Sequence, residues 1–193
     1  MRLAIHKSIS EERLIKGCLN NESKAQRTLY EKFSPKMFAI CLRYVSDHSQ
    51  AEDIMINGFM KVFNKISQYS GEGSFEGWIR RIMVNESLAF IRKNKNMYLE
   101  VDIEAANFQP DYGLLQNNLE AEDLMKLVKD LPMGYKTVFN LYAIEGYSHK
   151  EIAAMLNISE NTSKSQLSRA RNLLQHKLLE SQKILTKNTL SYE

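Results

Sequence analysis

The side chains best suited to chemistry in this 193-residue chain are hydrogen-bonding groups and cations gathered in one short stretch. Between Tyr147 and Arg171 two helical patterns, 148–155 and Glu160 onward, flank a short turn at 156–159. Such a pair has the outline of a helix-turn-helix. The outward positions of the second pattern carry the side-chain types that contact phosphates and base edges in the DNA major groove. They are Asn161, Thr162, Lys164, Ser165, Gln166, Ser168, Arg169 and Arg171.

Local chemistry at the turn supports this interpretation. Asn157 stands where the chain must reverse direction, and Asn adopts the left-handed backbone conformation more readily than most other residues. Ser159 is then placed to cap the second helix. Apolar residues recur at helical spacing on one face of each pattern, namely Ile152, Met155 and Leu156, then Leu167, Ala170 and Leu174. The alternative is an ordinary helical hairpin with a solvated polar face.

A second stretch also suits a nucleic acid. Between Tyr69 and Lys93, aromatic and basic side chains interleave, and single-stranded nucleic acids need rings for stacking and cations along the backbone. The residues concerned are Tyr69, Phe75, Trp78, Arg80, Arg81, Asn85, Arg92 and Lys93. The alternative is that the rings belong to the hydrophobic core. We favour that alternative for Trp78 but not for Tyr69, which lies in a polar loop.

Catalytic and metal chemistry find no support. The four histidines show no triad or metal-ligand spacing, and no glycine-rich phosphate loop follows a strand pattern. His48 and Glu52 are one helical turn apart but lack a third ligand, so we interpret them as surface residues. The sequence therefore predicts no enzyme, no metal, no cofactor and no small-molecule substrate.

Composition indicates a globular intracellular protein. The chain is 44% hydrophobic with a net charge of +3 and a pI of about 8.7, too mild a balance to establish a nucleic-acid partner. Two cysteines, Cys18 and Cys41, form no disulfide framework. No apolar run resembles a signal peptide or a membrane span. We expect a cytoplasmic protein without membrane insertion.

The three prolines and eight glycines leave few breaks, which favours an all-α chain. In a first domain at 10–94 we expect helices at about 10–20, from 23 to 45 with a restart at Pro35, at 50–66 and at 75–93. The third of these has Phe59 within its apolar pattern. It also has Gly58 in its interior, at a cost of about 1 kcal/mol relative to alanine, which marks either close packing or a diverged surface.

The character of the chain changes after the first domain. Residues 95–117 read as a flexible acidic linker. A second domain at 118–180 is expected to contain helices at about 118–130 and 135–144 ahead of the helix-turn-helix. The polar tail at 181–193 is expected to fray.

Two helical domains with these features resemble the sigma-70 family of bacterial RNA polymerase specificity subunits. The resemblance is closest to the ECF (extracytoplasmic function) group, which keeps regions two and four, and it covers about Glu12 to Leu179. It implies a region 2 bundle and a region 4 helix-turn-helix joined by the linker. It implies a non-catalytic protein that binds core polymerase, reads minus-35 and minus-10 promoter elements and assists strand opening. Many members are held inactive by an anti-sigma protein, which is therefore a further candidate partner.

The resemblance also implies site residues. The segment AEDIMINGFMKVF would dock on core polymerase through Glu52, Asp53, Ile56, Asn57, Phe59 and Lys61. The minus-10 element would meet Tyr69, Arg80, Arg81 and Asn85, of which Tyr69 and Asn85 would hold a base flipped from the stack. The minus-35 duplex would meet Thr162, Lys164, Ser165, Gln166, Ser168 and Arg169.

The chain departs from the family pattern in places. Ile56 and Asn57 replace the usual Gln-Glu pair, and this favours a rival interpretation as a stand-alone helix-turn-helix regulator that does not engage polymerase. The stretch from Tyr69 to Lys93 favours the sigma interpretation, because such a regulator has no need to melt DNA. In the recognition helix Ser163 replaces a common Val, with weaker packing expected beneath the helix. Gln166 replaces a common Arg and offers an amide suited to adenine.

Overall fold

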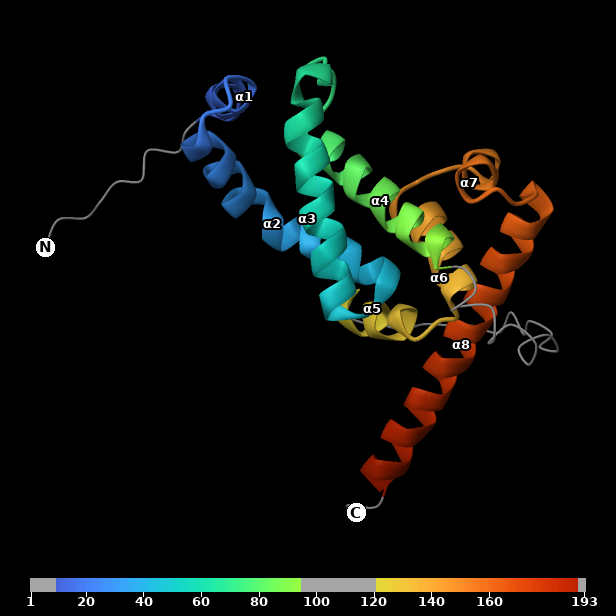
Figure 1. Cartoon of the computed structure of the whole chain (residues 1–193). Coiled ribbons are helices and arrows are strands. Elements are labelled where there is room, and N and C mark those ends of the chain that lie inside the picture. The colour runs from blue at the N-terminus through green and yellow to red at the C-terminus, as the bar shows by residue number, and fades with distance from the viewer. Residues whose placement is uncertain (1–9, 95–120, 191–193) are drawn as a thin grey trace, which may run out of the picture. The chain divides into compact units, whose positions relative to one another are not determined.

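The computed structural model describes residues 10–94 and 121–190, with only the backbone described at 121–124 and 181–190. All regular structure in these ranges is helical (Figure 1), which confirms the expected all-α class. The chain divides into two compact units, Met1–Phe90 and Ile91–Glu193, called here the first and second units. The whole of the expected linker at 95–117, together with 118–120, lies outside the described residues. No helix in the described part is long and apolar enough to cross a membrane.

The first unit is built from consecutive helices with short connections. In chain order they are α1 (Glu11–Leu19), α2 (Ser23–Val45), α3 (His48–Lys65), the 3-10 turn η1 (Ile66–Gln68) and α4 (Phe75–Lys93). The Ser10 hydroxyl accepts the Arg13 N–H at 3.4 Å and caps α1. The Asp47 carboxylate accepts the Gln50 N–H at 2.8 Å, so α3 begins at His48, slightly earlier than expected.

Pro35 does not restart α2, contrary to the prediction. The helix runs unbroken from Ser23 to Val45 with Pro35 inside it. Proline removes one backbone hydrogen bond and crowds the preceding turn. Here Pro35 lies on the exposed side of α2, while the buried Phe33 and Met37 on either side anchor the helix in the core. Packing therefore outweighs the local penalty.

The packing of α3 on α4 explains the glycine within α3. A Cβ added at Gly58 would overlap the sulfur of Met83 in α4, so a larger residue here would have to displace the buried Met83 side chain. Of the two expectations for Gly58, close packing is therefore correct. The surrounding core is formed by buried residues of α2, α3 and α4, among them Leu29, Met37, Tyr44, Ile54, Val62, Ile79 and Leu88.

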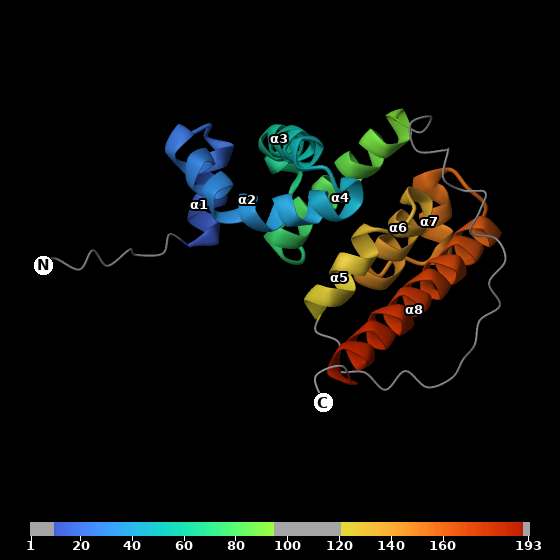
Figure 2. The same ribbon diagram turned by 90° about the horizontal axis from the view of Figure 1, so that it is seen from below.

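The second unit is organised around one long helix. Its elements are α5 (Ala121–Lys129), α6 (Met133–Phe139), the π-helical turn η3 (Asn140–Ile144), α7 (His149–Leu156) and α8 (Glu160–Leu190). Helices α5, α6 and α7 all contact α8 (Figure 2). One buried cluster consists of Val128, Leu131, Tyr135, Ala170 and Leu174. The backbone of α8 continues to Leu190, where the sequence predicts a fraying tail from Ser181 onward.

Candidate nucleic-acid interface

Side-chain caps define both helices of the helix-turn-helix. At the start of α7, Ser148 and Glu151 form a reciprocal capping box, in which the Glu151 carboxylate accepts the Ser148 N–H at 2.8 Å. The Ser-x-x-Glu spacing of this box is a local signal that is present in the sequence. At the end of α7, Asn157 has φ 54° and ψ 51°, the left-handed conformation expected for it. The turn is therefore determined by local residues.

The first turn of α8 uses some of the predicted contact residues for its own cap. The Ser159 hydroxyl accepts the Thr162 N–H at 2.9 Å, as predicted for an N-cap. The Ser159 and Thr162 hydroxyls also lie 2.8 Å apart, and the Ser165 hydroxyl donates to the Thr162 carbonyl at 3.0 Å. These hydroxyls therefore already have partners within the helix. Their remaining lone pairs can still accept hydrogen bonds.

The other predicted contact residues of α8 are not equally exposed. Lys164, Ser168 and Arg169 are exposed, and Lys164 lies 3.8 Å from the Glu160 carboxylate. Arg169 also donates to the Tyr135 hydroxyl at 3.4 Å. Gln166 is half-buried with its amide beside Gly134 of α6, where an added Cβ would come within 3.3 Å of it. The amide proposed to contact adenine therefore lies at the flank of the helix.

Ser163 faces inward and is not a packing defect. Its side chain is fully buried, and its hydroxyl oxygen lies 2.9 Å from Nδ1 of His149 in α7. The expectation that Ser163 weakens the packing beneath α8 takes no account of this hydrogen bond. The two residues are separated by 14 positions, so no local pattern indicates the contact.

In the first unit, the predicted melting residues differ in accessibility. Arg81 and Asn85 are exposed on α4 at i and i+4, so they share a face, and Arg80 is half-buried. Tyr69 lies in the loop before α4, with its ring 5.0 Å from that of Phe75 and 5.7 Å from that of Trp78.

Tyr69, Phe75 and Trp78 form one aromatic cluster, which decides how far each ring belongs to the hydrophobic core. The Tyr69 hydroxyl donates to the Gly73 carbonyl at 2.9 Å. Phe75 is fully buried, and Trp78 is half-buried and stacked on it, with the ring planes 13° apart. Phe75 is therefore a core residue, whereas Trp78 lies only partly within the core. Tyr69 is half-buried.

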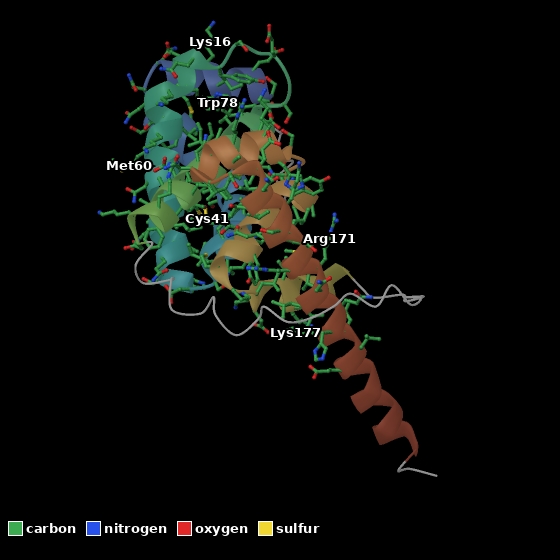
Figure 3. All side chains as sticks on the ribbon, turned by 90° about the vertical axis from the view of Figure 1, so that its right-hand side faces the viewer. Lys16, Cys41, Met60, Trp78, Arg171 and Lys177 are labelled. Carbon is green, nitrogen blue, oxygen red and sulfur yellow. The ribbon has the colours of Figure 1, made fainter. Side chains whose placement is uncertain are left out.

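The predicted polymerase-binding segment forms most of α3. Glu52, Asp53, Ile56 and Asn57 are exposed on one face. One outward residue was not predicted, namely Met60, which is 59% exposed and is labelled in Figure 3. Because Met60 follows Ile56 by one helical turn, the two apolar side chains form an exposed pair on this face.

Two residues assigned to polymerase contact have other partners. Phe59 is only 2% exposed, with its ring 4.8 Å from that of Tyr30, so its assignment as a contact residue is corrected here: it belongs to the core. Lys61 forms a 2.5 Å ion pair with Glu86 of α4. This pair joins α3 to α4, and Lys61 remains half-exposed beside it.

The cysteines are buried in the first unit. Desolvation by burial raises the pKa of the Cys41 thiol to about 11 and also raises the pKa of Cys18. A thiol with a raised pKa is a poor nucleophile, since the thiolate is the reactive form. In the described part of the chain, no three His, Cys, Asp or Glu side chains are grouped closely enough to hold a metal ion.

Comparison with known proteins gives this arrangement its context. Residues 29–97 match the family described as "Sigma-70 region 2", and residues 121–174 match "Sigma-70, region 4". The ECF RNA polymerase sigma-E factor of Haemophilus influenzae is 25% identical over 182 residues, 88% of this chain and 96% of that protein. The RNA polymerase sigma-H factor of Pseudomonas aeruginosa is 23% identical over 177 residues, 85% of this chain and 91% of that protein.

Similar solved structures include two complexes. One is the sigma factor RpoE with the anti-sigma factor NepR from Bartonella quintana, with 26% identity, a TM-score of 0.48, and coverage of 79% of this chain and 95% of that one. The other is CnrH with the cytosolic domain of CnrY, with 19% identity, a TM-score of 0.46, and coverage of 87% and 96%.

The chain belongs to the sigma-70 family of RNA polymerase sigma factors. Within that family it is of the ECF type, with region 2 in the first unit and region 4 in the helix-turn-helix of the second. The family consists of non-catalytic transcription initiation factors.

Proposed function

We propose that this sigma factor binds core RNA polymerase through the exposed face of α3 and reads promoter DNA with α8 and α4. The observation that carries the proposal is the division of α8 into a buried apolar face and an exposed face with Lys164, Ser168 and Arg169. A helix with such an exposed face, held by a helix-turn-helix, fits the major groove. This face, which also carries the exposed Ser165, would meet the minus-35 duplex, with the half-buried Thr162 and Gln166 at its edges.

The minus-10 element is assigned to the first unit. Asn85 and Arg81 share an exposed face of α4, which suits contact with a displaced strand and its phosphates. The half-buried Tyr69 would help hold a flipped base, and Arg80 would approach the backbone. Because polymerase and DNA lie in the cytoplasm, we place the protein there. An anti-sigma partner is an expectation from the family resemblance, and the described surfaces do not identify one.

Purified full-length protein and bacterial core polymerase would test this proposal together. We expect co-elution, and core-dependent transcription from a subset of templates in a library with randomised upstream sequence. The active templates would define the promoter. If the chain selects duplexes from the library but neither binds core polymerase nor supports transcription, it acts as a stand-alone helix-turn-helix regulator.

Replacing Arg169 with alanine should weaken binding to the selected duplex and reduce the steepness of its salt dependence by about one unit of slope. The physical reason is the loss of one exposed cation from the proposed DNA-facing surface of α8. Titrations at several salt concentrations measure both quantities. Lys177→Ala is the matched control, because Lys177 lies further along α8 and pairs with Asp130 at 3.8 Å. Unchanged affinity and slope for Arg169→Ala would remove this residue from the interface.

Asn85→Ala should slow promoter opening by about fivefold to tenfold, the effect of losing one hydrogen bond, while leaving duplex binding unchanged. Asn85 is exposed, so its truncation leaves the core of the first unit intact. Permanganate reactivity of the minus-10 thymines reports opening, and a gel-shift titration reports duplex binding. Asn20→Ala makes the same change at an exposed position at the end of α1, outside the proposed interfaces, and serves as the control. Equal losses in opening and duplex binding would refute the role assigned to Asn85.

A further inference from the structure

Ser163 is a polar residue within the apolar inner face of the recognition helix. The neighbouring inward positions of α8 are Leu167, Ala170 and Leu174, all buried, and Ser163 itself is fully buried. A buried hydroxyl without a partner is costly, so the 2.9 Å contact with Nδ1 of His149 is the feature that makes this residue acceptable here. The contact joins the first turn of α7 to the first turn of α8.

The imidazole of His149 is itself held in one orientation. Its ring is stacked on that of Tyr142, with centroids 4.6 Å apart and planes 23° apart. Tyr142 belongs to the π-helical turn η3, and the Arg171 guanidinium of α8 lies 5.7 Å from the centroid of the same ring. Figure 3 labels Arg171 on α8. Tyr142 thus contacts both His149 of α7 and Arg171 of α8, two turns beyond Ser163 along the same helix.

A hydrogen bond constrains geometry differently from an apolar contact. Apolar side chains gain nearly the same free energy over a range of relative positions, whereas a hydrogen bond weakens steeply as its angle departs from linear. With its ring orientation held by Tyr142, His149 accepts the Ser163 hydroxyl from one direction when its proton is on Nε2. This restricts rotation of the first two turns of α8, where Thr162, Lys164 and Ser165 lie.

We propose that His149 is a positioning residue for the recognition helix, setting the orientation of α8 relative to α7 through Ser163. The proposal rests on the proposed function of α8 as the reader of duplex DNA. His149 itself need not touch DNA. A merely structural hydrogen bond would affect the stability of the second unit, whereas a positioning bond also sets the affinity for the duplex.

Two substitutions that preserve shape separate these roles. His149→Phe keeps a ring for stacking on Tyr142 but leaves the Ser163 hydroxyl buried without its partner. Ser163→Val removes the hydroxyl and leaves Nδ1 of His149 without this hydrogen-bond partner. The double variant places two apolar side chains against each other and leaves neither polar group unpaired. Its melting temperature should therefore return close to that of the wild type. Its duplex affinity should stay about threefold to tenfold weaker, within the effect of one hydrogen bond, because the directional contact is still missing.

The probe is the duplex selected from the randomised library by the wild-type protein, with binding measured well below all melting temperatures. Leu178→Ala is the control for lost stability, because Leu178 is a buried residue of α8 about four turns beyond Ser163. It should lower the melting temperature without changing duplex affinity. Joint recovery of stability and affinity in the double variant would overturn the proposal, as would wild-type affinity in both single variants.

A measurement without DNA separates failure of this inference from failure of the proposed function. Residual dipolar couplings of the amides in α7 and α8 report the angle between the two helices. We expect this angle to change in His149→Phe and to remain changed in the double variant. If the wild-type protein selects no duplex, the proposed reading of the minus-35 element fails. Independently of that result, dipolar couplings in the variants equal to those of the wild type would overturn the positioning role of His149.

Discussion

Placing glutamate at both Ile56 and Met60 is expected to lower the affinity for core polymerase by about 100-fold or more. These apolar side chains are 44% and 59% exposed and lie one turn apart on α3. Truncating a hot-spot residue at the centre of an interface costs about 2 kcal/mol or more, and burying an unpaired carboxylate adds a desolvation cost. About 2.7 kcal/mol corresponds to the 100-fold loss. Titration of fluorescently labelled protein with core polymerase measures the affinity.

The control for this change is Leu19→Glu. Leu19 is 46% exposed on α1 of the same unit, so the substitution has the same chemistry and similar exposure at a position outside the proposed interface. It should leave the affinity for core polymerase unchanged. The melting temperature of the Ile56 and Met60 variant should also stay near that of the wild type, since neither residue is buried. Wild-type affinity in the charged variant would show that polymerase does not cover this face of α3.

The helix-turn-helix was predictable because its signals are local. Asn157 and Ser159 act on backbone groups within a few residues of themselves, so their types and positions alone indicate the turn and the cap. The capping box of Ser148 and Glu151 is equally local and could have been found from its spacing. Helical spacing also identified the buried face of α8, including Leu167 and Ala170. Local sequence therefore predicts where this part of the fold begins and turns.

Contacts between distant segments were not predictable in the same way. The bond between His149 and Ser163 and the ion pair between Lys61 and Glu86 depend on how separate helices are oriented. Tyr69 lies in a polar loop by sequence, yet its ring packs against residues that follow on α4. A residue type indicates what a side chain can do. Tertiary packing decides whether it is exposed to do so.

Phe59 shows two predictions in conflict. Its place in the apolar pattern of α3 predicts a core residue, while the family resemblance suggested a polymerase contact. The 2% exposure of Phe59 and the Tyr30 ring 4.8 Å away agree with the apolar pattern. The family resemblance assigns the whole helix to polymerase contact, whereas helical periodicity distinguishes its buried face from its exposed face. Exposed positions on α3 are therefore better candidates for contact.

Phe59→Ala is accordingly expected to destabilise the first unit by about 3–5 kcal/mol, because it removes a buried ring and leaves a cavity. For a unit of this size the loss corresponds to a fall in melting temperature of roughly 12–40 °C. Hydrogen exchange of amides in α2 and α3, followed by mass spectrometry, measures the change. Binding to polymerase should fall only because less of the unit is folded.

The exposed neighbour Ile56 provides the comparison. Ile56→Ala should change stability by no more than about 0.5 kcal/mol, as usual for surface substitutions, while weakening polymerase binding directly. The two alanine variants on one helix should thus show opposite patterns: large loss of stability for Phe59, and loss of affinity at unchanged stability for Ile56. If Phe59→Ala kept wild-type amide protection and still lost polymerase affinity, Phe59 would be a contact residue after all. Its side chain would then have to become exposed when the complex forms.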